Sequence, residues 1–195
     1  SGVGSFDIGQ VITNRLKLSL NNSDEEYDEY DFAEAEVTAW RGGILQDGTR
    51  ELLQCGIFTV HEHKRPDSSV DLTCLDFMTK TERSYTEVST AYPATIQPIV
   101  QDICNKCGIV LATSAIDNGS YVVEKRPNDE ALTCRDMLHY AAQISGNYVR
   151  CNVYGGLEFR WYDETKQGHK ITALKSFTPE EQDIVITGIQ VTDAG

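Results

Sequence analysis

Residues 15–20 read Arg-Leu-Lys-Leu-Ser-Leu, and this alternation of polar and apolar side chains decides how the first part of the chain folds. Successive side chains of a β-strand point to opposite faces, so Leu16, Leu18 and Leu20 would lie together on one face. The segment therefore predicts a strand that is buried on one side. Strand-like segments continue as far as Met78.

Three further strands are predicted before the pattern changes, at residues 34–40, 52–61 and 69–75. Glycine-containing turn signals separate them, at residues 41–43 and 47–48. Several short strands joined by turns indicate an antiparallel barrel or sandwich.

The hydrophobic period becomes helical after Thr95, which would cap the start of a helix that Gly108 ends. The same frame returns at an offset of 38 residues, where Thr133 stands in the place of Thr95 and Gly146 in the place of Gly108. The chain thus contains a short internal repeat of two capped helices.

A β-hairpin is predicted around Tyr154-Gly155-Gly156, and a last strand pattern begins at Ile184. These elements predict an α+β fold built on antiparallel, barrel-like β modules, with a smaller unit of two helices and a hairpin. We expect a barrel-like module at 1–80, an α+β module at 81–170, and at 171–195 a strand that returns to a β module. Both ends are expected to be cuts within a longer protein.

The chain carries 30 acidic and 17 basic residues, a formal charge of −13 that repels nucleic-acid phosphates. Many acidic residues share one short window: Asp24, Glu25, Glu26, Asp28, Glu29, Asp31, Glu34 and Glu36. Such a run is usually a solvated loop, and a cation site or a basic partner is the alternative. No apolar run approaches the roughly 20 residues that span a bilayer, and no signal-peptide pattern opens the sequence.

Six cysteines are present, which is far below the density of a disulfide scaffold: Cys55, Cys74, Cys104, Cys107, Cys134 and Cys151. Buried free thiols are therefore expected. Cys104 and Cys107 have the CxxC spacing, but they fall late in a helix and have no second CxxC or His pair to complete a zinc site. We expect no metal or redox role for them.

Histidines and acidic residues offer no complete catalytic set. On a strand, His61 and His63 would share one face and Glu62 would oppose them, so two solvated edge histidines are expected. His139 is expected to be a packed or half-exposed residue of the second helix, and His169 to lie in a polar loop. No hydrolase, metalloprotease or phosphate-binding motif occurs. We expect no catalytic, cofactor or metal site and no enzymatic activity.

Aromatic side chains suggest a second class of function, a carbohydrate-binding β domain. Five of them could stack on sugar rings: Trp40, Tyr148, Tyr154, Trp161 and Tyr162. Because Trp161 and Tyr162 follow Phe159 and Arg160 in one strand pattern, core or interface packing is the expected role.

An ordered series of short motifs runs through most of the chain. The series comprises residues 6–9 before a strand, 56–60 in a hairpin, 72–78 leading into a polar connector, 92–95 opening the first helix, 102–104 with Gly108, Gly146, and 156–162. In order and spacing it resembles the baseplate-hub, or tail-associated, protein family of phage and prophage tail tips. That family is similar to the hub of contractile phages and to the spike base of type VI secretion.

The resemblance implies a structural protein of the virion tail tip, synthesised in the bacterial host cytoplasm. It implies a homotrimeric ring with two related β-barrel modules per subunit, in contact with the distal tail protein or tail-tube ring and with the tape-measure protein. DNA would pass through the ring without sequence-specific binding, and no cofactor is implied. The alternatives are an extracellular carbohydrate- or receptor-binding β module and part of a tail-associated peptidoglycan hydrolase.

Overall fold

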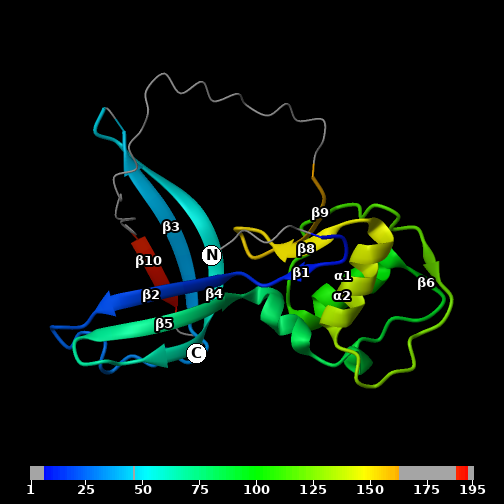
Figure 1. Ribbon diagram of the computed structural model, residues 1–195, viewed down its shortest axis with the longest axis horizontal. Helices are drawn as coiled ribbons and strands as arrows, with labels where there is room; N and C mark the ends of the chain where they lie inside the picture. The colour runs from blue at the N-terminus through cyan, green and yellow to red at the C-terminus, as the bar shows by residue number, and fades with distance from the viewer. Residues whose placement is uncertain (1–6, 46, 163–187, 193–195) are drawn as a thin grey trace.

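The computed structural model describes residues 7–45, 47–162 and 188–192 (Figure 1). A curled antiparallel sheet, here the sheet unit, lies beside a unit of two helices and small sheets, here the helical unit. The predicted α+β class with a barrel-like module is confirmed, since the large sheet curls into a half-barrel. His169 and most of the predicted final segment lie outside the described residues.

The sheet unit contains five strands in the order β10-β3-β4-β5-β2, all antiparallel to their neighbours. The strands are β2 (Arg15–Asn21), β3 (Glu36–Ile44), β4 (Arg50–Lys64), β5 (Ser69–Asp76) and β10 (Gly188–Thr192). Leu18 pairs with Leu72, and Leu16 pairs with Cys74. The register places the alternating leucines of β2 opposite buried residues of β5, on the single face that the sequence predicts for them.

The connection from β2 to β3 contains the acidic window, and one aromatic residue holds it on the sheet. Phe32 is only 1% exposed and packs with Val37, Val70 and Leu72 in the core of the sheet unit. Arg65 lies over the Phe32 ring, and its guanidinium donates hydrogen bonds to backbone carbonyls of this connection. The acidic side chains around this anchor are exposed, as expected for a solvated loop.

The turn predicted at residues 41–43 is wrong, because β3 continues through these residues and pairs with residues 51–53 of β4. The chain reverses only at Gly48, which has a positive φ of 81°, and Asp47 stabilises that turn by accepting a hydrogen bond from the Thr49 amide at 2.9 Å. Pairing with β4 therefore overrides the local turn preference of two glycines.

The helical unit contains two α-helices, two short 3₁₀ helices labelled η1 and η2, and two small sheets. Its elements are β1 (Val11–Ile12), η1 (Phe77–Glu82), η2 (Tyr85–Glu87), β6 (Ala94–Thr95), α1 (Ile96–Cys107), β7 (Val122–Val123), α2 (Cys134–Ser145), β8 (Tyr148–Cys151) and β9 (Leu157–Arg160). The predicted hairpin is confirmed as β8 and β9. β1 pairs in parallel with β8, so these residues of the expected 1–80 module belong to the sheet of the helical unit.

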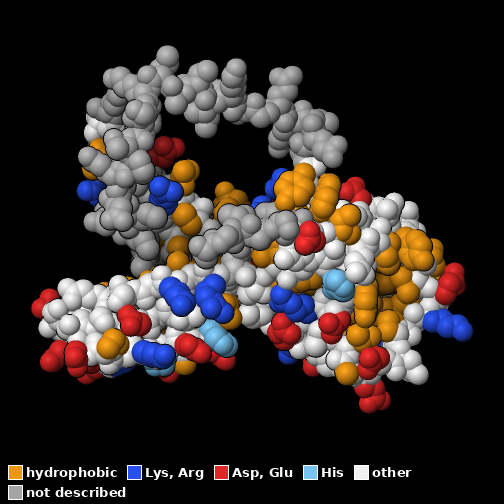
Figure 2. Space-filling model, in the orientation of Figure 1, with side chains coloured by type: hydrophobic (Ala, Val, Ile, Leu, Met, Phe, Trp, Pro, Cys, Tyr) orange, Lys and Arg blue, Asp and Glu red, His pale blue; other side chains and the backbone are white. Residues whose placement is uncertain are grey.

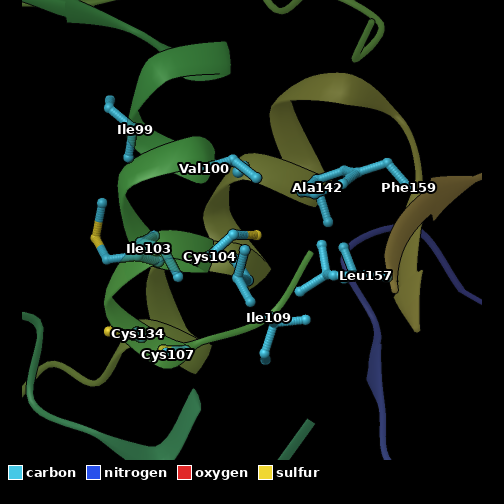
Figure 3. Close-up of a cluster of buried hydrophobic side chains, with 14 of the residues drawn as sticks. Ile99, Val100, Ile103, Cys104, Cys107, Ile109, Cys134, Ala142, Leu157 and Phe159 are labelled. Atoms are coloured by element: carbon cyan, nitrogen blue, oxygen red, sulfur yellow. The ribbon is translucent and has the colours of Figure 1, made fainter. Parts of the chain in front are cut away.

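The core of the helical unit lies between the two helices and the β8–β9 hairpin (Figure 3). Val100, Ile103 and Cys104 of α1 are fully buried, as are Ala142 of α2 and Leu157 of β9. The apolar face that the sequence predicts for the first helix is thus the face that packs against the rest of the unit.

Both helices end at the predicted glycines, since Gly108 and Gly146 adopt the left-handed conformation at φ 65° and 71°. Their starts differ. The Thr133 hydroxyl accepts a hydrogen bond from the Asp136 amide at 3.1 Å, and the Asp136 carboxylate accepts one from the Thr133 amide at 2.8 Å. Thr95 occupies the same position in α1 but makes no capping bond with its side chain.

This difference predicts unequal effects of two matched substitutions. Thr133→Ala should lower the free energy of unfolding by about 1 kcal/mol, because the capping bond is lost. Thr95→Ala should change it by less than about half of that amount, since no capping bond exists to lose. Denaturant unfolding followed by circular dichroism measures both values, and equal losses would contradict the assignment of the cap.

Candidate functional site

The histidine pair of β4 does not form a site. The register of β4 against β5 shifts between Val60 and Glu62, so His61 is the extra residue of a β-bulge and the expected alternation of His61 and His63 is interrupted. Both histidines are exposed, and His63 packs its ring against Phe32 at 6.3 Å. The predicted solvated position is confirmed, although the two residues do not share a regular strand face.

His139 of α2 has a structural contact with the N-terminal segment. Its Nδ1 lies 2.6 Å from the carbonyl oxygen of Gly9, while the Gly9 amide donates to the Asn147 carbonyl at 2.8 Å. Gly9 has φ 86°, and a Cβ there would lie 2.5 Å from Gln143 Cγ. His139 thus fastens a segment whose close approach requires glycine.

Five of the six cysteines are buried and Cys55 is exposed. Burial raises the pKa of the Cys104 and Cys151 thiols to about 12 and that of Cys74 to about 11. Within 7–45, 47–162 and 188–192, no group of three or more His, Cys, Asp or Glu side chains is placed to hold a metal ion. None of the helices in this part of the chain is long and apolar enough to cross a membrane.

Three of the five aromatic residues considered for sugar binding, Tyr148, Trp161 and Tyr162, pack against one another. Trp161 lies edge-on to Tyr162 at 5.2 Å between ring centroids, with the two ring planes at 73°. Tyr148 is tilted against both rings at 6.3–6.4 Å. Rings that stand at such angles do not form one flat surface for a sugar, so this arrangement is typical of aromatic packing.

The junction of the two units is organised by Asp76, the last residue of β5. Its carboxylate accepts hydrogen bonds from the Asn14 amide at 2.9 Å, from Asn14 Nδ2 at 2.7 Å and from the Met78 amide at 3.1 Å. Burial raises the pKa of Asp76, although these hydrogen bonds act in the opposite direction. Asn14 lies in the segment that joins β1 to β2, and Met78 lies in the segment that follows β5. The Asp76 side chain therefore binds both of these segments, each of which passes from one unit to the other.

The strongest candidate for an interaction surface is the end of the β3–β4 hairpin. Four large apolar side chains there are exposed by 74%, 48%, 54% and 61%, and together they form the apolar hairpin tip: Ile44, Leu45, Leu52 and Leu53. The hairpin projects away from the rest of the sheet unit (Figure 1). Exposed apolar patches of this kind mark sites of interaction with other molecules.

The acidic side chains of the sheet unit lie in a different place from its exposed apolar side chains. Figure 2 shows acidic side chains along the lower edge of the sheet unit and hydrophobic ones between the upper part of β4 and the turn of the β8–β9 hairpin. Gln54 Nε2 of β4 donates a hydrogen bond to the Val153 carbonyl at 2.9 Å, which links β4 to the turn of the β8–β9 hairpin. Val153 and Tyr154 are themselves exposed, by 39% and 72%. This surface could not be predicted from the sequence, because exposure depends on which strands pair.

No family model and no curated protein matches this chain. Among solved structures, the 43 kDa tail protein of prophage MuSo2 from Shewanella oneidensis is similar, with 14% identity and a TM-score of 0.49 over 80% of this chain. The match covers 48% of that protein, so this chain spans about half of its length. A likeness this distant does not assign the chain to a family.

The geometry at Asp76 makes a quantitative prediction. Asp76→Ala should lower the free energy of unfolding by about 3 kcal/mol, because buried donors of Asn14 and Met78 lose their acceptor. Asp71→Ala is the matched control on β5, since Asp71 is exposed and accepts a bond only from the Ser19 side chain among the described contacts; its effect should be below about 0.5 kcal/mol. Thermal and denaturant unfolding measure both, and a negligible effect at Asp76 would contradict its role at the junction.

Proposed function

We propose that this chain is a structural component of a phage or prophage tail tip, a subunit of a baseplate-hub ring, and that it has no enzymatic activity. The ordered motif series supports the identity of the assembly. Its segments coincide with the structural elements: residues 56–60 lie in β4, residues 72–78 lead from β5 into η1, and residues 92–95 lead into α1. The observation that carries the proposal is the apolar hairpin tip.

Both faces of the hairpin tip carry an exposed leucine. Leu52 pairs with Gly42 and Leu53 with Arg41, so successive leucines of β4 point to opposite faces of the hairpin. An apolar side chain on one face can be covered by a flat surface, but leucines on both faces require insertion between two surfaces. Removing each leucine from water contributes about 2 kcal/mol, which favours such insertion.

A ring of identical subunits supplies such surfaces, because each subunit contacts its neighbour through two different faces. In this proposal the hairpin tip of one subunit inserts at the boundary with the next in a homotrimer. The ring would join the distal tail protein or tail-tube ring to the tip and let the tape-measure protein and DNA pass. An acidic surface suits that passage, since it does not bind DNA phosphates.

The proposed place of action is the tail tip of the virion, after synthesis in the cytoplasm of the bacterial host. Among the described residues, no group of three or more His, Cys, Asp or Glu side chains is placed to hold a metal ion, and five of the six cysteines are buried. The tail-associated hydrolase alternative would therefore need residues other than the candidates considered above.

Self-association tests the proposal. The chain should associate with increasing concentration in sedimentation velocity, towards a trimer. The double variant Leu52→Asp with Leu53→Asp should weaken association by about a hundredfold or more, because apolar burial is lost and charge is introduced at the contact.

Val110→Asp is the control, since Val110 is 75% exposed but lies outside the hairpin. This variant should associate like the unchanged chain, and all three proteins should give the same circular dichroism spectrum. A chain that stays monomeric at every concentration, or a double variant that associates normally, would refute the role of the hairpin tip.

A further inference from the structure

Two cysteines meet where α1 ends and α2 begins. Cys107 is the last residue of α1 and Cys134 is the first of α2, and they are 5% and 0% exposed. The Cys134 thiol donates a long hydrogen bond to the Ser84 carbonyl at 4.0 Å, and Figure 3 shows the sulfur atoms of Cys107 and Cys134 at the lower end of α1. The two thiols thus lie in one buried cluster at the meeting point of the two helices.

Arg83 holds the two helix ends in this arrangement. Its carbonyl accepts a hydrogen bond from the Cys134 amide at 2.8 Å, and its guanidinium donates to the Lys106 carbonyl at 3.0 Å. Glu87 forms ion pairs with Lys106 at 3.1 Å and with Arg83 at 3.7 Å. These three side chains are 37–50% exposed, and their charges act on Cys107, so the thiol pair lies close to the surface.

The charges around the pair favour one particular thiolate. The neighbouring Cys134 thiol lowers the pKa of Cys107, and the cations of Arg83 and Lys106 act in the same direction, while burial and Glu87 oppose them. The neighbouring Cys107 side chain, together with burial, raises the pKa of Cys134. Cys107 is also the more exposed of the two, at 5% against 0%, and both observations favour Cys107 as the attacking thiol and Cys134 as the thiol that resolves the mixed disulfide.

We propose that Cys107 and Cys134 form a reversible disulfide, with a small-molecule disulfide such as oxidised glutathione as the oxidant. The Cys107 thiolate attacks one sulfur of the oxidant, which forms a mixed disulfide and releases one glutathione thiolate. Cys134 then loses its proton and attacks the Cys107 sulfur, which releases the second glutathione. Two protein thiols are oxidised, and the oxidant is reduced to two thiols that take up the two protons.

Cys104 is not the partner, although it completes the CxxC spacing. Its side chain points into the core of the helical unit, towards Leu157, and away from Cys107 (Figure 3). It is fully buried, and burial raises its pKa to about 12. The reactive pair joins two helices instead of lying within one.

Peptide mapping tests the pair in the full chain carrying Cys55→Ser, which removes the exposed thiol. The reduced protein is incubated with oxidised glutathione, quenched in acid, alkylated and digested. We expect a peptide linked through Cys107 and Cys134, its loss on adding dithiothreitol, and alkylation of the remaining cysteines. Cys104→Ala should leave the linked peptide in place.

Two single variants test the order of attack. Cys134→Ser should accumulate glutathione on Cys107, whereas Cys107→Ser should show none on Cys134. A peptide linked through Cys104 and Cys107, no linked peptide, or glutathione on Cys134 in the Cys107→Ser variant would overturn the proposal.

Circular dichroism establishes that each variant is folded. Limiting iodoacetamide on the unchanged chain gives a second measurement that needs no variant, since Cys107 should be alkylated ahead of Cys134. The reverse order would overturn the proposal.

Discussion

The arrangement of the two units depends on the buried carboxylate of Asp76. It binds the segment that enters the sheet unit at Asn14 and the segment that leaves it before Met78. Arg135 of α2 also binds the segment that enters the sheet unit, since its guanidinium donates hydrogen bonds to the Val11 carbonyl at 2.6 Å and to the Thr13 hydroxyl at 2.9 Å. A buried carboxylate is stable only when hydrogen-bond donors surround it. Asp76 therefore depends on the donors of Asn14 and Met78, and the positions of these two residues depend in turn on Asp76.

Sequence reasoning succeeded where structure is determined locally. Leucine alternation at residues 15–20 and the Thr and Gly residues that frame both helices placed those elements closely. It failed where distant pairing decides, as at residues 41–43, where a strand replaces the expected turn. The contact of Cys107 with Cys134 could not be predicted either, because the CxxC spacing draws attention to Cys104 and the true partner belongs to another helix.

The sheet unit separates its charged and apolar surfaces. Phe32 fixes the acidic connection over the buried face of the half-barrel, so the charges around it lie on the lower edge (Figure 2). The hairpin tip carries the exposed leucines at a different place on the same unit. Like charges disfavour contact along one surface, while the apolar tip favours contact at another. This separation limits the ways in which copies of the chain can meet.

The parallel pairing of β1 with β8 means that neither unit is continuous in sequence. Residues 11–12 belong to the sheet of the helical unit, residues 15–76 supply β2 to β5, and the helical unit then resumes at η1. Unfolding the helical unit would free the N-terminal strand that leads into β2, and cutting the chain after Asp76 would remove β1 from its neighbour. The two units are therefore expected to unfold in a single cooperative transition and to resist separate expression.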